Sequence, residues 1–110
     1  SRLYSDFCAS NLSTHVEMDT VHSSRESKKT LLTMFFTREK LFLAFLMNRC
    51  TKGAVRLIFD RLEKRMGTYE FVSVFEYILT DRGSKFVDPD TLETGVTGIQ
   101  RSSIYYCDPM

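Results

Sequence analysis

The chain has 110 residues, of which 43% are hydrophobic and 26% charged, and its formal net charge is +1. This length and composition predict one globular domain. The net charge itself excludes little: it lacks the strong basic excess that would indicate non-specific nucleic-acid binding, although DNA enzymes often keep their basic surface local. The longest apolar run, residues 41–47, is too short to cross a bilayer, and the N-terminal residues lack the pattern of a signal peptide. We therefore expect a cytoplasmic protein without membrane contact.

The chain begins at Ser1 without a methionine and ends at Met110, just past a strand-like segment. From this we expect an excised domain. Residues 1–13 form a leader segment, and residues 2–10 within it have a short helical pattern. The domain itself is expected to occupy residues 14–110.

The segment THVEMDTV, residues 14–21, alternates between apolar and polar positions, which predicts a strand. Glu17 and Asp19 share the polar face of this strand. The polar segment that follows, HSSRESKK, predicts a loop.

Residues 30–36 (TLLTMFF) and 41–47 (LFLAFLM) are two further strand-like segments, joined by the four residues TREK. This spacing predicts an antiparallel hairpin. Both segments are almost continuously apolar, so we expect both of their faces to be covered, as in the middle of a layered α/β sheet. Residues 41–46 are accordingly interpreted as a core strand and not as a platform for base stacking.

A helix is predicted from Thr51, which can cap its start, to Gly67, which can end it. An i,i+4 pair of Asp60 and Lys64 is expected on its solvent side. The apolar stripe of the helix consists of Val55, Ile58, Phe59, Leu62 and Met66.

Residues 68–75 (TYEFVSVF) fit either a second short helix or an approach to the next strand, which is YILT at residues 77–80. Asp88 and Pro89 predict the start of a one-turn helix, and SIYY predicts a last strand. The predicted order is three strands, a helix, a strand, a short helix and a strand. This order indicates an α/β fold with an antiparallel hairpin at one side.

Two aspartates occupy unusual positions. Asp19 interrupts a strand that favours apolar groups, and Asp81 ends the buried strand YILT, two residues before Gly83. Aspartate is also typical of turns, and TDRG is good turn chemistry by itself. If the two strands are neighbours, however, the carboxylates approach each other and require a cation between them. Oxygen ligands favour Mg²⁺ or Mn²⁺ over zinc.

In this order, the segments VEMDTV, LLTMFFTREKLFLAFLM, ILTDRGSKF and YYCDP resemble the catalytic core of bacterial insertion-sequence transposases. That core belongs to the retroviral-integrase, ribonuclease H-like group with an Asp-Asp-Glu triad. The resemblance extends from about Thr14 to the end of the chain. It implies a mixed sheet, with the first three strands antiparallel and the later strands parallel, flanked by helices.

The resemblance also implies roles for residues. Asp19 matches the first acid of the triad and Asp81 the second, and the third, a glutamate, is expected on a helix beyond Met110. The implied activity is DNA strand cleavage and strand transfer with Mg²⁺ or Mn²⁺. The 110-residue fragment itself is expected to be inactive. Lys85 stands where many relatives carry an acid, so it receives no metal role.

The implied partners are transposon ends and target DNA, with a homo-oligomer expected for the full-length protein. Basic residues near the acids in the chain are candidate phosphate contacts, although solvated surface lysines are the alternative. These candidates are Lys28, Lys29, Arg82, Lys85 and, less directly, Arg101.

Other polar residues receive a structural interpretation. Glu17 could assist Asp19, but a solvated charge is favoured. Asp88 is explained as a helix cap, a metal role for Asp90 is not favoured, and Asp108 before Pro109 is explained as a turn residue.

The histidines and cysteines carry no metal or redox motif. His15 and His22 have no partner at ligand spacing, and the three cysteines form no Cys-x-x-Cys pair. Cys8, Cys50 and Cys107 are interpreted as incidental thiols in a reducing compartment.

Two other classes of function stay open. One is a non-catalytic, degenerate integrase fold that serves in dimerisation or DNA contact. The other is a phospho-acceptor signalling domain, which also places aspartates around Mg²⁺ at strand ends. Such domains have a regular parallel sheet, and the predicted hairpin of residues 30–47 argues against one.

Overall fold

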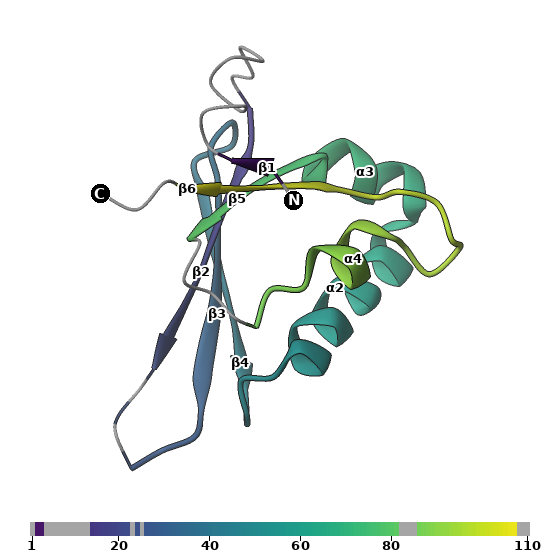
Figure 1. Ribbon diagram of the computed structural model, residues 1–110. Coiled ribbons are helices and arrows are strands. Elements are labelled where there is room, and N and C mark those ends of the chain that lie inside the picture. Colours follow the sequence, from purple (N-terminus) through teal and green to yellow (C-terminus); the bar gives the residue numbers. More distant parts are fainter. Residues whose placement is uncertain (1, 4–13, 23, 25, 82–85, 108–110) are drawn as a thin grey trace.

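The computed structural model describes residues 2–3, 14–22, 24, 26–81 and 86–107. These residues form a six-stranded mixed sheet, with the helices gathered on one of its faces (Figure 1). The strands are β1 (Arg2–Leu3), β2 (Val16–His22), β3 (Thr30–Phe36), β4 (Leu41–Met47), β5 (Tyr77–Asp81) and β6 (Ser103–Cys107). The helices are α2 (Lys52–Met66), α3 (Thr68–Phe75) and α4 (Pro89–Glu93).

The strand order is β1-β6-β5-β2-β3-β4. Strand β2 pairs antiparallel with β3, and β3 pairs antiparallel with β4. On the other side, β2 pairs parallel with β5, and β6 pairs parallel with both β5 and β1. The predicted α/β class with a mixed sheet is therefore confirmed, and the condition set for the two aspartates, that β2 and β5 are neighbours, is met.

The hairpin of β3 and β4 has the predicted bounds, because the short polar turn between the two apolar segments fixes their register. Phe36 pairs with Leu41 at the closed end and Thr30 with Met47 at the open end. Lys40 closes the turn with a φ of 58°, in the left-handed region.

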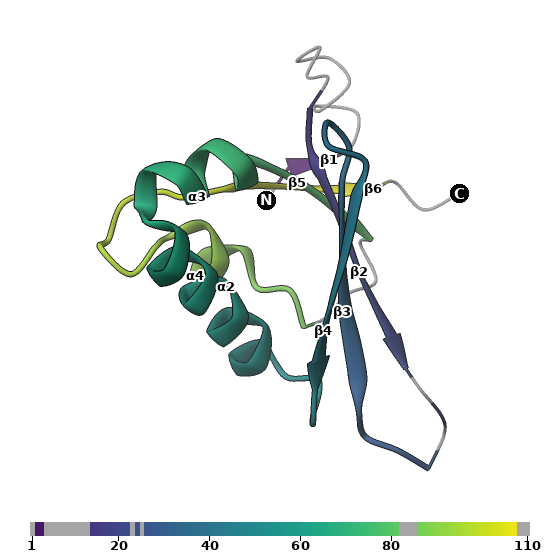
Figure 2. The same ribbon diagram turned by 180° about the vertical axis from the view of Figure 1, so that it is seen from behind.

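The core lies between the sheet and the helices, as Figure 2 shows from behind. Alternate residues of the central strands face the helices, and the aromatic rings of α2 and α3 fill the space. The Phe71 and Phe75 rings stack with centroids 4.4 Å apart, and Phe36 meets Phe75 edge-on at 5.4 Å. The fully buried apolar residues include Leu32, Met34, Val55, Phe59, Phe71, Ile78 and Ile104.

The prediction that both faces of 41–47 are covered is wrong. Strand β4 is at the edge of the sheet, and Phe42 and Leu46 are 61% and 60% exposed. In the part of the chain that the structure describes, helices cover only the opposite face (Figures 1 and 2). An apolar sequence shows that a strand can be buried on both faces, but other elements decide whether it is.

The predicted leader helix is also wrong for its first residues. Arg2 and Leu3 form β1 and pair in parallel with Tyr105 and Tyr106 of β6. A short i,i+4 pattern does not meet the cost of helix nucleation, whereas the edge of a sheet offers ready backbone partners. Residues 4–10 lie outside the described residues.

Helix α2 begins and ends where its capping residues predict. The Thr51 hydroxyl accepts a hydrogen bond from the Ala54 N–H at 3.0 Å. At the other end Gly67 has a φ of 89°, and its N–H donates to the Glu63 carbonyl oxygen at 2.8 Å. Helix α3 starts at the next residue. Residues 68–75 are therefore a helix and not an extended approach to β5. None of the described helices is long and apolar enough to cross a membrane.

A buried arginine joins α2 to α4, and it corrects two expectations. Arg101 is 1% exposed, and its Nη1 donates to Asp60 Oδ1 at 2.8 Å and to Glu63 Oε1 at 3.0 Å. Its Nε donates to the Leu92 carbonyl oxygen at 2.7 Å. Arg101 therefore does not contact DNA phosphates, and Asp60 faces Arg101 instead of pairing on the solvent side with Lys64. Sequence spacing could not show this, since Asp60 and Arg101 are 41 residues apart.

Glu63 is the centre of this buried network. Besides Arg101, the Thr68 hydroxyl donates to its Oε2 at 2.7 Å and the Val96 N–H to its Oε1 at 3.0 Å. Burial alone raises the pKa of the Glu63 carboxyl, but these hydrogen bonds and the charge of Arg101 outweigh it, and the pKa is lowered. Gly95 leaves room for the carboxylate, because a Cβ there would lie 2.6 Å from Oε1.

Candidate metal centre

Asp19 and Asp81 lie on neighbouring parallel strands. The register pairs Val16 with Ile78 and Met18 with Thr80, so the next position along both strands holds Asp19 and Asp81. Neighbouring strands are about 4.8 Å apart, and residues of the same parity point to the same face. The pairing thus brings together two carboxylates that are far apart in the sequence, as the chain pattern predicts.

Both aspartates line one cavity of about 480 Å³ on the sheet face opposite the helices. Its walls come from four adjacent strands, β2, β3, β4 and β5. Both side chains are exposed, so their carboxylates are within reach of solvent and of a ligand. The lining residues are Glu17, Met18, Asp19, Thr33, Phe35, Phe42, Leu79, Thr80 and Asp81.

Local hydrogen bonds hold Asp19 in place. Its Oδ1 accepts from the Thr20 N–H at 2.8 Å, and its carbonyl oxygen accepts from the Thr33 hydroxyl at 3.2 Å. Thr33 is the register partner of Asp19 on β3. The sequence analysis missed Thr33, although a threonine within the apolar segment TLLTMFF was a usable signal.

Glu17 lies two residues before Asp19 and lines the same cavity. Its Oε2 is 2.9 Å from Nε2 of His15. The glutamate thus has a neighbour at the far side from Asp81, which agrees with its interpretation as a surface charge.

The donor set suits a hard divalent cation. Mg²⁺ is commonly bound by one or two carboxylates, with water and substrate phosphate oxygens completing its shell. Asp19 and Asp81 can supply the two carboxylates. Within the described ranges, no group of three or more His, Cys, Asp or Glu side chains is arranged to hold a metal ion by itself. The residues therefore fit a cation that shares its coordination with substrate and water, and they do not fit a closed structural site.

Apart from Arg101, the predicted DNA-contact residues are four, and they fall into two groups. Lys28 and Lys29 are exposed and precede β3, but neither lines the cavity of the two aspartates. Lys28 lines a different cavity, at the start of α2. Arg82 and Lys85 lie outside the described residues, as does Gly83.

Asp88 and Asp90 do not line the cavity of the two aspartates. Asp88 precedes α4 as predicted, but its backbone carbonyl, and not its side chain, accepts the hydrogen bonds of the first turn. Asp90 is exposed on α4, and Asp108 lies outside the described residues.

Comparison with known proteins adds no relative. Neither the protein-family models nor the curated proteins compared with this chain give a match.

Proposed function

We propose that this chain is the core of a DDE transposase or integrase, which cuts and joins DNA with Mg²⁺ or Mn²⁺. The observation that carries the proposal is the placement of Asp19 and Asp81 at adjacent positions of paired parallel strands, on one exposed face. Turn formation explains Asp81 alone, but it does not explain a second exposed aspartate beside it in the middle of β2.

The strand directions support a ribonuclease H-like arrangement. Strands β2, β3 and β4 are antiparallel in sequence order, and β5 and β6 continue the sheet in parallel on the other side of β2. This is the pattern that the resemblance implies. It also argues against a phospho-acceptor domain, whose sheet is parallel throughout.

The chemistry follows from the open position of the site. A divalent cation there would activate a water or a DNA 3′-hydroxyl and stabilise the leaving oxygen. Asp19 and Asp81 would bind the cation and orient it toward the substrate. Their exposure leaves the sheet face accessible to a DNA strand. The resemblance supplies the third acid from beyond Met110, so we assign the activity to a longer protein and not to these 110 residues alone.

The test is strand cleavage by that longer protein carrying Asp81→Asn. The substitution keeps the side-chain volume but removes one charge that holds the cation, so we expect metal-dependent cleavage to fall by roughly 10²-fold or more. Asp90→Asn, on the exposed side of α4, removes the same charge outside the cavity and should leave cleavage unchanged.

A folded Asp81→Asn protein with undiminished cleavage would overturn the proposal. Absence of cleavage by both the parent and the variant, together with absence of metal binding by the 110-residue chain, would favour the alternative function. In that case the chain is a non-catalytic, degenerate integrase fold that serves in dimerisation or DNA contact. Rapid phosphorylation of Asp81 by acetyl phosphate would instead revive the phospho-acceptor alternative.

A further inference from the structure

A second cavity, of about 700 Å³, lies where β2 ends, β3 begins and the chain enters α2. It has no lining residue in common with the cavity of Asp19 and Asp81. Its size is within the range of pockets that hold small ligands. The lining residues are His22, Ser24, Ser27, Lys28, Thr30, Arg49, Cys50, Thr51 and Phe86.

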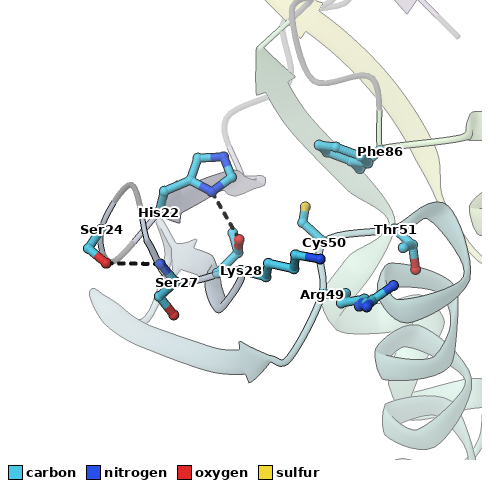
Figure 3. Close-up of a pocket in the computed structure, with 9 residues that line it drawn as sticks. His22, Ser24, Ser27, Lys28, Arg49, Cys50, Thr51 and Phe86 are labelled. Atoms are coloured by element: carbon cyan, nitrogen blue, oxygen red, sulfur yellow. Dashed lines mark hydrogen bonds between the residues drawn. The ribbon is translucent and has the colours of Figure 1, made fainter.

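The lining is basic, and none of its described residues has an acidic side chain. Lys28 extends from its loop toward the start of α2, where Arg49 and Thr51 lie (Figure 3). Within the described part of the chain, neither Lys28 nor Arg49 is paired with a carboxylate. Burial raises the pKa of the Cys50 thiol, so this thiol adds no negative charge to the cavity at neutral pH. Two positive charges therefore face one cavity without an internal counter-ion.

The groups around the two charges are held in place by the protein. The Ser27 N–H donates to the Ser24 hydroxyl, and the Lys29 N–H donates to the Ser27 hydroxyl, both at 3.1 Å, on either side of Lys28. His22 Nδ1 is 3.1 Å from the hydroxyl of Thr30, a fully buried residue. This contact fixes the imidazole ring and leaves its Nε2 edge for a ligand.

The start of α2 adds to the same field. Thr51 caps the Ala54 N–H, and the first turn contains no acidic residue that would offset the positive end of the helix dipole. Opposite this end, Phe86 and Cys50 give the cavity an apolar wall (Figure 3). The cavity thus offers charge for a phosphate and an aromatic side chain for a base or sugar.

We propose that this cavity binds one nucleotide of a DNA strand, with Lys28 and Arg49 on the phosphate and Phe86 beside the base or sugar. The inference rests on the proposed function, because it names where the same DNA substrate is held outside the acidic site. His22 is three residues beyond Asp19 on β2, about 10 Å along the strand, and this odd spacing puts the two side chains on opposite faces of the sheet. A DNA strand that occupies both sites therefore has to pass around the end of β2.

The test uses the 110-residue chain and a fluorescent oligothymidylate, with thymidine 5′-monophosphate and inorganic phosphate as smaller probes. Lys28→Gln with Arg49→Gln should weaken oligothymidylate binding by roughly tenfold or more. It should also reduce the slope of log affinity against log salt by about 0.7, the value for one single-strand phosphate contact. The matched control is Lys64→Gln with Arg65→Gln, which removes two charges from the exposed last turn of α2 and should change neither quantity.

Several results would overturn the inference. One is equal weakening by the test pair and the control pair, which would mean diffuse electrostatic attraction. Another is an affinity for thymidine monophosphate that is no higher than the affinity for inorganic phosphate, which would mean that the cavity binds anions in general.

Asp81→Asn separates this inference from the proposed function. The inference predicts that, in buffer without divalent cations, this variant keeps its oligothymidylate affinity. If the variant binds the oligonucleotide normally and still holds Mn²⁺, the proposed function fails and the nucleotide pocket stands.

Discussion

Glu63 and Arg101 are charged side chains that are buried, at 1% exposure each. Each neutralises the charge of the other and satisfies its hydrogen bonding. The Arg101 guanidinium also lies 5.5 Å from the ring centroids of Phe59 and Phe71. A buried pair of this kind adds little net stability, but the loss of one partner leaves an uncompensated charge. The network therefore fixes how α2, α4 and the entry to β6 fit together.

Replacing Arg101 tests this role. Arg101→Leu leaves Glu63 buried without its cation, and we expect the free energy of unfolding to fall by about 3–5 kcal/mol in urea titrations. Arg65→Leu, at an exposed position of α2, removes the same charge and should change it by no more than about 0.5 kcal/mol. Equal effects would show that Arg101 is a surface residue.

Glu63 gives the fold a predictable response to acid. A carboxyl whose pKa is lowered by folding stabilises the protein above its unfolded value of about 4.3, and this stabilisation is lost as pH falls through the lower folded value. The pKa of Glu63 is lowered by Thr68, Val96 and Arg101 against the effect of burial.

We therefore expect Glu63→Gln to be less stable than the parent near neutral pH, and to lose less of its remaining stability between about pH 5 and about pH 3. Urea titrations across this range measure the effect. Glu70→Gln, at an exposed position of α3, should keep the parental acid response. A parental response in Glu63→Gln would contradict the assignment.

Strand β4 shows what sets the cost of a substitution within one hairpin. Leu32 of β3 faces the helices and is fully buried, whereas Leu46 of β4 is 60% exposed on the edge. Edge strands tolerate lysine, which also discourages pairing with another chain.

We expect Leu46→Lys to change the free energy of unfolding by less than about 0.5 kcal/mol, and Leu32→Ala to lower it by about 2–5 kcal/mol. Urea unfolding of both variants checks the assignment of faces. A large loss for Leu46→Lys would mean that β4 is covered on both sides after all.

For the molecule as a whole, local sequence signals predicted most elements but not their environment. The Thr51 cap, the Gly67 stop and the hairpin bounds follow from interactions within a few residues. The pairing of β2 with β5, which places Asp19 beside Asp81, joins strands that are separated in the chain by β3, β4 and two helices, so local signals left it as a condition. The burial of Arg101 and the exposure of β4 depend on contacts between distant segments, which periodicity does not record. The role of Arg49 beside Lys28 was missed for the same reason.

The central claim is that Asp19 and Asp81 hold one cation, and Mn²⁺ titration of the ¹⁵N-labelled 110-residue chain tests it most directly. Paramagnetic broadening should centre on residues 17–20 and 79–81 and spare the last turn of α2. It should disappear in Asp19→Asn or Asp81→Asn and persist in Asp90→Asn. Broadening that is centred elsewhere would contradict the shared cation site. Broadening that is the same in the parent, in Asp19→Asn and in Asp81→Asn would contradict it as well.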